Sequence, residues 1–117
     1  PWVVTSSDGT NGHPRKYASF PKKYQSYVMD KSLISLADFI NRSSSQTAKL
    51  LGLSKRGVLK TNYKADIIVF DPKNYAAKAD FSNWNKYSSG VEQVVVNGQL
   101  VIENKKYLNI YAGKFVQ

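Results

Sequence analysis

The distribution of apolar residues predicts a short buried strand at the start of the chain, followed by a loop and helices. Residues 2–5 form an apolar, β-branched run without alternation, which is typical of a strand buried on both faces of a parallel sheet. The segment 9–23 is rich in Gly, Pro, Asn and Lys, and it predicts a long loop. Helical spacing of apolar residues then predicts a short helix over residues 24–31.

A second helix is predicted to start at Ser35. Ser35 and Asp38 match a capping box, in which the serine oxygen accepts an unpaired N–H of the first helical turn. An apolar stripe that begins at Leu36 continues the helix to about Arg42.

A third helix is predicted over residues 46–51. Ala48 and Leu51 would face inward. Gly52 can adopt the left-handed conformation that ends a helix, and Leu53 would then fold back against the last turn.

From residue 55 onward the pattern becomes strand-like. Residues 57–59 predict the start of a strand, residues 67–70 a buried strand, and residues 107–116 a last edge strand. Residues 91–102 predict a hairpin, because the Asn-Gly pair at 97–98 accepts positive φ at both central positions of a type I′ turn. The order of elements is therefore a strand and helices first and a β layer later, which indicates an α/β fold.

The segment between the predicted strands, residues 73–90, lacks a regular pattern. It carries three aromatic residues, Phe81, Trp84 and Tyr87. We expect these rings to cover the edge of the core rather than to bind a ligand.

Composition limits the class of protein. The 117 residues suit one domain or a piece of a larger one, and the 42% of apolar residues is enough to build a core. No cysteine is present, no apolar run approaches the ~20 residues of a membrane helix, and no signal peptide is visible. These features lead us to expect a cytoplasmic protein. The chain starts at Pro1 without an initiator methionine, so we expect that the natural N-terminus is missing.

The net charge of +9 raises the possibility of a polyanion-binding surface. Lysine and arginine are interleaved with tyrosine at 15–17 and at 22–24, a pattern that could track phosphates and stack bases. We favour the simpler interpretation of a solvated, lysine-rich surface, because no nucleic-acid-binding motif accompanies the charge.

The residues most capable of chemistry follow the first predicted strand. Asp8 stands after two serines and before a glycine, and a carboxylate beside a metal-bound water can accept the water proton and return it to a leaving nitrogen. The alternative is that Asp8 only caps a turn, as is common in Asp-Gly pairs. Arg15 could bind a carboxylate with its two-pronged guanidinium, or it could be an ordinary surface residue.

The chain holds no plausible set of metal ligands. His13 is its single histidine, whereas a catalytic zinc takes about three protein ligands, mostly His, carboxylate and Cys. Residues outside this chain would have to complete a metal site, or there is no metal.

These residues resemble a known family. The segment 6–9 (Ser-Ser-Asp-Gly), followed by 12–15 (Gly-His-Pro-Arg), is similar to the last barrel strand and the following loop of the N-acyl-D-amino-acid deacylases, the D-aminoacylases of the amidohydrolase superfamily. The segments 65–71 and 94–98 follow in the family's order. Asn62 stands where the family usually has a glycine, and asparagine tolerates the left-handed conformation.

The resemblance implies a metal-dependent (β/α)8 barrel joined to a small β-sandwich. Residues 1–54 would hold the final barrel strand, the active-site loop and the following helices, and residues 55–117 the C-terminal β-sandwich segment. Asp8 would be the general acid and base, Arg15 would bind the substrate carboxylate, and His13 would shape the loop. The zinc ligands of the family would lie upstream of this chain.

Three functional hypotheses follow. In the first, the parent protein hydrolyses N-acyl-D-amino acids and this fragment alone is inactive. In the second, the chain is a small basic module that binds nucleic acid or another polyanion. In the third, it is an assembly domain. A truncated barrel strand exposes an apolar face and an unpaired edge, so we also expect the isolated chain to self-associate.

Overall fold

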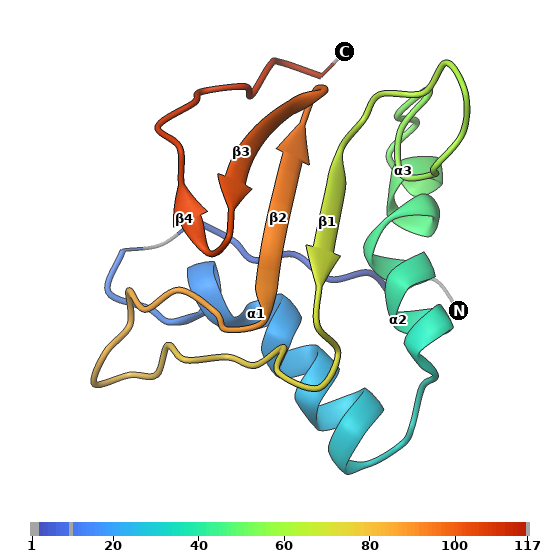
Figure 1. Cartoon of the computed structure of the whole chain (residues 1–117). Helices are drawn as coiled ribbons and strands as arrows, with labels where there is room; N and C mark the ends of the chain where they lie inside the picture. Colours follow the sequence, from blue (N-terminus) through green and yellow to red (C-terminus); the bar gives the residue numbers. More distant parts are fainter. Residues whose placement is uncertain (1–2, 10, 117) are drawn as a thin grey trace.

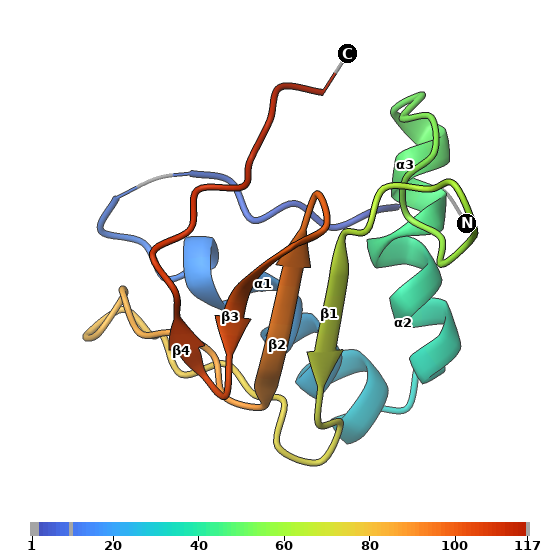
Figure 2. The same ribbon diagram turned by 45° about the horizontal axis from the view of Figure 1, so that its top comes forward.

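The protein consists of helices followed by a small antiparallel sheet. A computed structural model describes residues 3–9 and 11–116. In two views of it, α1 lies behind the sheet and α2 and α3 stand beside β1 (Figure 1 and Figure 2). The elements in chain order are α1 (Arg15–Lys23), the π-helix η1 (Tyr24–Asp30), α2 (Leu36–Ser43), α3 (Ser45–Leu50), β1 (Ile67–Phe70), β2 (Val91–Val96), β3 (Gln99–Glu103) and β4 (Lys106–Tyr107).

The sheet has the order β1-β2-β3-β4, and each neighbouring pair is antiparallel. Ile68 pairs with Val94, which pairs with Ile102 on the next strand. Asn97 and Gly98 connect β2 to β3 with φ of 48° and 81°, so the predicted type I′ hairpin is confirmed. The predicted strand at 67–70 is also present, as β1, but it is not buried.

Asn97 also ties the hairpin to two other segments. Its Oδ1 accepts a hydrogen bond from Arg56 at 3.0 Å, and its Nδ2 donates to the Ala112 carbonyl at 2.7 Å. Its backbone N–H donates to Asp66 Oδ1 at 2.8 Å, and Asp66 also forms an ion pair with Arg56. The loop before β1, the hairpin and the C-terminal segment are therefore joined at one residue.

An aromatic cluster centred on Tyr24 joins the helices to the sheet. The Tyr24 side chain is only 2% exposed, and its ring centroid lies 5.4 Å from that of Phe39 on α2 and 5.5 Å from that of Tyr75. Tyr75 in turn lies 4.9 Å from Phe70 on β1, and the Tyr24 hydroxyl donates to the Pro72 carbonyl at 2.9 Å. Burial of such rings is the largest source of core stability in a domain of this size.

The predicted loop over 9–23 is wrong from Arg15 onward, where α1 begins and runs directly into η1. Pro21 lies inside α1 and has no N–H to donate to the carbonyl of Tyr17, four residues earlier. The Ser88 hydroxyl donates to that carbonyl at 2.9 Å. Ser88, which is distant in sequence, thus supplies to the Tyr17 carbonyl the hydrogen bond that Pro21 cannot donate. The helix predicted over 24–31 is confirmed as a continuation of α1.

The caps of α2 and α3 are those predicted. The Ser35 side chain accepts from the Asp38 N–H, and the Asp38 carboxylate accepts from the Ser35 N–H. At the end of α3, Gly52 has a φ of +66° and donates to the Lys49 carbonyl, and Leu53 donates to the Ala48 carbonyl at 2.8 Å. This is the Schellman motif. Ala48 is buried as predicted.

Five predictions about the fold were wrong in whole or in part. Leu51 is 63% exposed rather than inward-facing, and the strand at 67–70 is exposed at its two central residues rather than buried. Residues 3–5 form no strand (residue 2 lies outside the described residues), and residues 57–59 form none either. The expected edge strand at 107–116 ends at Tyr107, the last residue of β4. A strand needs a continuous hydrogen-bonded neighbour, and beyond β4 the described residues supply only the backbone bond from the Leu108 N–H to the Val101 carbonyl.

Residues 73–90 are irregular, as predicted, apart from one bridge between Ala76 and Ser89. Asn62 adopts a φ of 67°, so the turn tolerates asparagine in place of glycine. Within residues 3–9 and 11–116, no helix combines the length and apolar character needed to cross a membrane.

Asn97→Gly tests whether the Asn97 side chain stabilises the fold by joining the hairpin to Arg56 and Ala112. Glycine keeps the positive φ of the turn, but the bonds to Arg56 and Ala112 are lost. We expect the free energy of unfolding to fall by about 1–3 kcal/mol in urea denaturation. Asn104→Gly is the matched control, because Asn104 also has a φ of 48° in a turn but makes no side-chain hydrogen bond within the described residues. Equal effects of the two substitutions would contradict this role.

The Tyr75 phenol makes the core sensitive to alkali. Burial raises the pKa of Tyr75 from 10.0 to about 12. The folded state therefore keeps a proton that the unfolded state has lost, so stability is full below pH ~10 and falls as the pH rises towards ~12. Urea denaturation at pH 9 and pH 11 should show this loss in the wild type and a smaller one in Tyr75→Phe. If the free energy of unfolding depended on pH identically in both proteins, Tyr75 would not be the source of the alkaline loss of stability.

Candidate active site

Asp8 lies in an extended segment before α1, with a φ of 47° that few residues other than glycine adopt. Its Oδ1 accepts the N–H of Gly9 at 2.7 Å, and its own N–H lies 3.5 Å from the Ser6 hydroxyl oxygen. The side chain therefore does cap the local turn, as one of the two sequence interpretations proposed. Its second oxygen, Oδ2, is left to face another partner.

That partner is Arg15, the first residue of α1. The Arg15 guanidinium forms an ion pair with Asp8 Oδ2 at 2.8 Å, with side-chain exposures of 41% and 62%. The pair thus joins the residue predicted to be catalytic to the residue predicted to bind a carboxylate.

His13 lies beside this pair. Its Nδ1 accepts a hydrogen bond from the backbone N–H of Arg15 at 3.1 Å. Its ring meets that of Phe81 edge-to-face, with centroids 5.1 Å apart and the planes at 75°. All three residues singled out from the sequence are therefore brought together.

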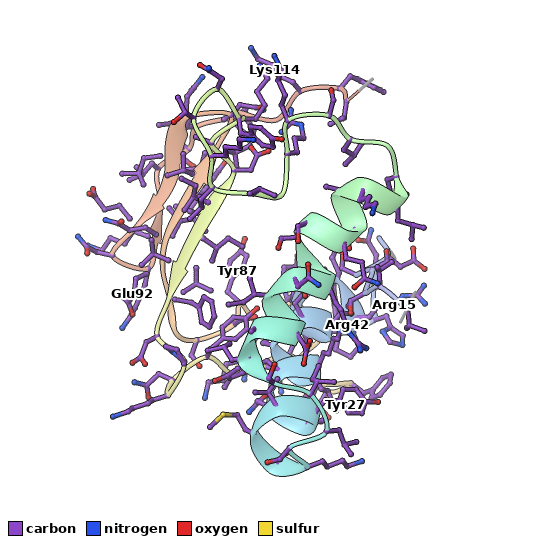
Figure 3. All side chains as sticks on the ribbon, turned by 90° about the vertical axis from the view of Figure 1, so that its right-hand side faces the viewer. Arg15, Tyr27, Arg42, Tyr87, Glu92 and Lys114 are labelled. Carbon is purple, nitrogen blue, oxygen red and sulfur yellow. The ribbon has the colours of Figure 1, made fainter. Side chains whose placement is uncertain are left out.

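His13 and Arg15, but not Asp8, line an open hollow of about 980 Å³. Its other lining residues include polar residues of α1 and the segment 3–6, which leads to Asp8. In Figure 3, Arg15, Arg42 and Tyr27 lie on the side of the helices that faces away from the sheet, and all three line the hollow. Phe81 also lines it. The expectation that the rings of the segment 73–90 cover the edge of the core is wrong for Phe81 and Tyr87, which are 78% and 81% exposed.

Lys23 is a site residue that the sequence analysis treated only as part of a charged surface. Its Nζ donates to the Thr5 hydroxyl at 2.6 Å and lies 5.8 Å from the Phe39 ring centroid. Burial, and then the charge of Arg42, lowers the pKa of Lys23. The segment carrying Asp8 is thus attached to α1 at two points. The signal was available, because polar residues at 15, 19, 23 and 26 repeat at helical spacing.

The residues present do not by themselves fit a metal ion. Within the described part of the chain, no group of three or more His, Asp and Glu side chains comes close enough together to hold one. The Asp8 carboxylate, which precedes His13 in the sequence, is already engaged by Gly9 and Arg15.

The chain belongs to a recognised class of protein. The model of the amidohydrolase family matches residues 3–101, and the chain belongs to that family. Within it, the chain is 33% identical over 110 residues to the N-acyl-D-aspartate deacylase of Alcaligenes xylosoxydans xylosoxydans, covering 91% of this chain and 22% of the relative. It is also 33% identical over 102 residues to the D-aminoacylase of the same organism, covering 87% of this chain and 21% of that relative. The chain thus spans about a fifth of the length of these relatives.

Solved structures agree with this assignment. The crystal structure of a D-aminoacylase, which defines a subset of amidohydrolases, matches with a TM-score of 0.90 and 32% identity over 97% of this chain and 25% of that one. The N-acyl-D-glutamate deacylase of Bordetella bronchiseptica, complexed with zinc and a phosphonate inhibitor, matches with a TM-score of 0.73 and 35% identity. The match covers 76% of this chain and 19% of that one. The resemblance to D-aminoacylases predicted from the sequence is confirmed.

The exposure of the Asp8–Arg15 pair makes it a poor source of stability. Exposed ion pairs contribute about 0–1 kcal/mol, so we expect Asp8→Asn to change the free energy of unfolding by less than about 1 kcal/mol in urea denaturation. Asp66→Asn is the comparison variant, because Asp66 is bonded to both Arg56 and Asn97, and it should cause the larger loss. A larger loss from Asp8→Asn would assign that residue a structural role.

Proposed function

We propose that this chain is the C-terminal part of a metal-dependent amidohydrolase that hydrolyses the amide bond of N-acyl-D-amino acids. The observation that carries the proposal is the 2.8 Å contact between Asp8 and Arg15 beside a large open hollow. It is supported by relatives that are named for deacylating N-acyl-D-aspartate and N-acyl-D-glutamate.

In this proposal Asp8 is the catalytic residue. Amide hydrolysis needs a base that removes a proton from the attacking water and an acid that protonates the leaving nitrogen. One carboxylate can do both in turn, and general acid–base help of this kind contributes roughly 10²–10⁴ in rate. The turn that holds Oδ1 presents Oδ2 towards the hollow-lining Arg15.

Arg15 binds the carboxylate of the substrate. A guanidinium offers two parallel donors to a carboxylate, and this geometry selects for acids over neutral amides. Before substrate enters, the Asp8 carboxylate occupies that position. A substrate carboxylate that takes its place releases Asp8, so binding at Arg15 makes the base available for chemistry.

The remaining parts of the enzyme would come from outside this chain. We propose that residues 1–54 contribute the last barrel strand, the loop and the following helices, and that residues 55–117 contribute part of a β-sandwich. The metal would be zinc, as in the N-acyl-D-glutamate deacylase complex, with ligands supplied by the rest of the protein. The 117-residue chain alone would then be inactive. The cytoplasmic location and the self-association of the isolated chain stay predictions.

The test is an assay of the full-length protein with N-acetyl-D-amino acids, their L-isomers and added chelator. We expect hydrolysis of the D-isomers, loss of activity with chelator, and a fall in kcat of roughly 10²–10⁴ in Asp8→Asn. Asp80→Asn is the matched control, because the Asp80 carboxylate lines the hollow and its turn-capping oxygen survives in asparagine. It should retain activity.

Two results would count against the proposal. Unchanged kcat in Asp8→Asn would remove Asp8 from the mechanism. An absence of hydrolysis by the metal-loaded wild-type protein, together with salt-sensitive binding to single-stranded DNA, would favour the polyanion-binding alternative, which none of the comparisons supports.

A further inference from the structure

The start of α1 is capped in an unusual way. The first N–H groups of a helix have no partner within the helix, and a Ser, Thr, Asp or Asn at the N-cap position usually accepts one of them. Here the N-cap residue is Pro14, whose ring offers no acceptor. The preceding residue, His13, takes this role: its Nδ1 accepts the N–H of Arg15 at 3.1 Å.

This bond defines the chemical state of the imidazole. A nitrogen that accepts a hydrogen bond carries no proton, so this geometry corresponds to the tautomer in which Nδ1 is unprotonated. The orientation of the ring is also held from a second side, by the edge-to-face contact with Phe81 at 5.1 Å. His13 therefore connects the segment 73–90 to the backbone of Arg15.

We propose that His13 is a positioning residue for Arg15 in substrate binding. Its Nδ1 holds the Arg15 backbone at the first turn of α1, from where the guanidinium reaches the Asp8 carboxylate at 2.8 Å. This inference rests on the proposed function of Arg15 as the residue that binds the substrate carboxylate. It goes beyond that function by assigning the histidine as a hydrogen-bond acceptor rather than a metal ligand or a base.

The tautomer can be measured directly, because His13 is the single histidine of the chain. In 15N-labelled protein at neutral pH, long-range 1H–15N correlations should show a proton on Nε2 and an unprotonated Nδ1. A proton on Nδ1 would overturn the proposal. This measurement uses the 117-residue chain and does not depend on enzymatic activity.

Two substitutions test the hydrogen-bond acceptor of His13 and its ring contact with Phe81 separately. His13→Asn keeps an acceptor two residues before Arg15, in the geometry of an Asx-turn, but removes the ring contact. His13→Phe keeps a ring beside Phe81 but removes the acceptor. In the full-length enzyme we expect His13→Phe to raise the KM for N-acetyl-D-amino acids roughly 2- to 10-fold with kcat little changed, the effect of one lost hydrogen bond. His13→Asn should restore the KM.

A comparison of the acid with its amide shows whether the change in KM caused by His13→Phe acts through Arg15. With the N-acetyl-D-amino acid amide, which lacks the carboxylate, His13→Phe should leave the KM unchanged. Failure of His13→Asn to restore the KM for the acid, or an equal effect of His13→Phe on acid and amide, would show that the ring serves only to pack against Phe81.

If the wild-type enzyme hydrolyses neither compound, the proposed function fails. The positioning role is then decided by the tautomer and by whether the Arg15 Nε–H resonance shifts in His13→Phe and returns in His13→Asn.

Discussion

The burial of Tyr24 is the interaction on which the rest of this structure depends. Its ring contacts α2 through Phe39, the sheet through Phe70 and the segment after β1 through Tyr75, while its hydroxyl donates to the Pro72 carbonyl. One buried aromatic residue thus joins the helices, the sheet and the segment that follows β1. The helix that carries Arg15 continues directly into η1, whose first residue is Tyr24, so the core also places the candidate active site.

The site itself is assembled from short-range contacts on that helix. Lys23 holds Thr5, and Arg15 holds Asp8, so the extended segment lies along α1 although the described residues give it no strand to pair with. Both cations belong to the polar face of the helix. The Asp8–Arg15 contact is weak in isolation, because the pair is largely exposed. A weak contact is compatible with the proposed exchange of Asp8 for a substrate carboxylate at Arg15.

Much of the fold was predictable where local chemistry decides the conformation. The Ser35 capping box, the Gly52 cap and the Asn-Gly turn each depend on residues within a few positions of one another, and all three were confirmed. The start of α1 was not predictable, because the Pro21 defect is relieved by Ser88, far away in sequence. The strand expected at 2–5 depends on neighbours that the described residues do not supply. The three residues Asp8, His13 and Arg15 were found because their spacing matched a family motif. Lys23 was missed because the segment 9–23 was interpreted as a loop, so the helical spacing of its polar residues was not used.

The two sequence interpretations of Asp8, a turn cap and a catalytic carboxylate, are compatible in this geometry. One oxygen accepts the Gly9 N–H and the other faces Arg15, so the carboxylate is held at both ends. A left-handed conformation at a residue other than glycine costs of order 1–3 kcal/mol and persists where surrounding contacts hold it. Here the turn bond supplies part of that support, and it also points the second oxygen outward. The turn is thus the means by which Asp8 is presented, which explains why an Asp-Gly pair can serve local structure and chemistry with the same side chain.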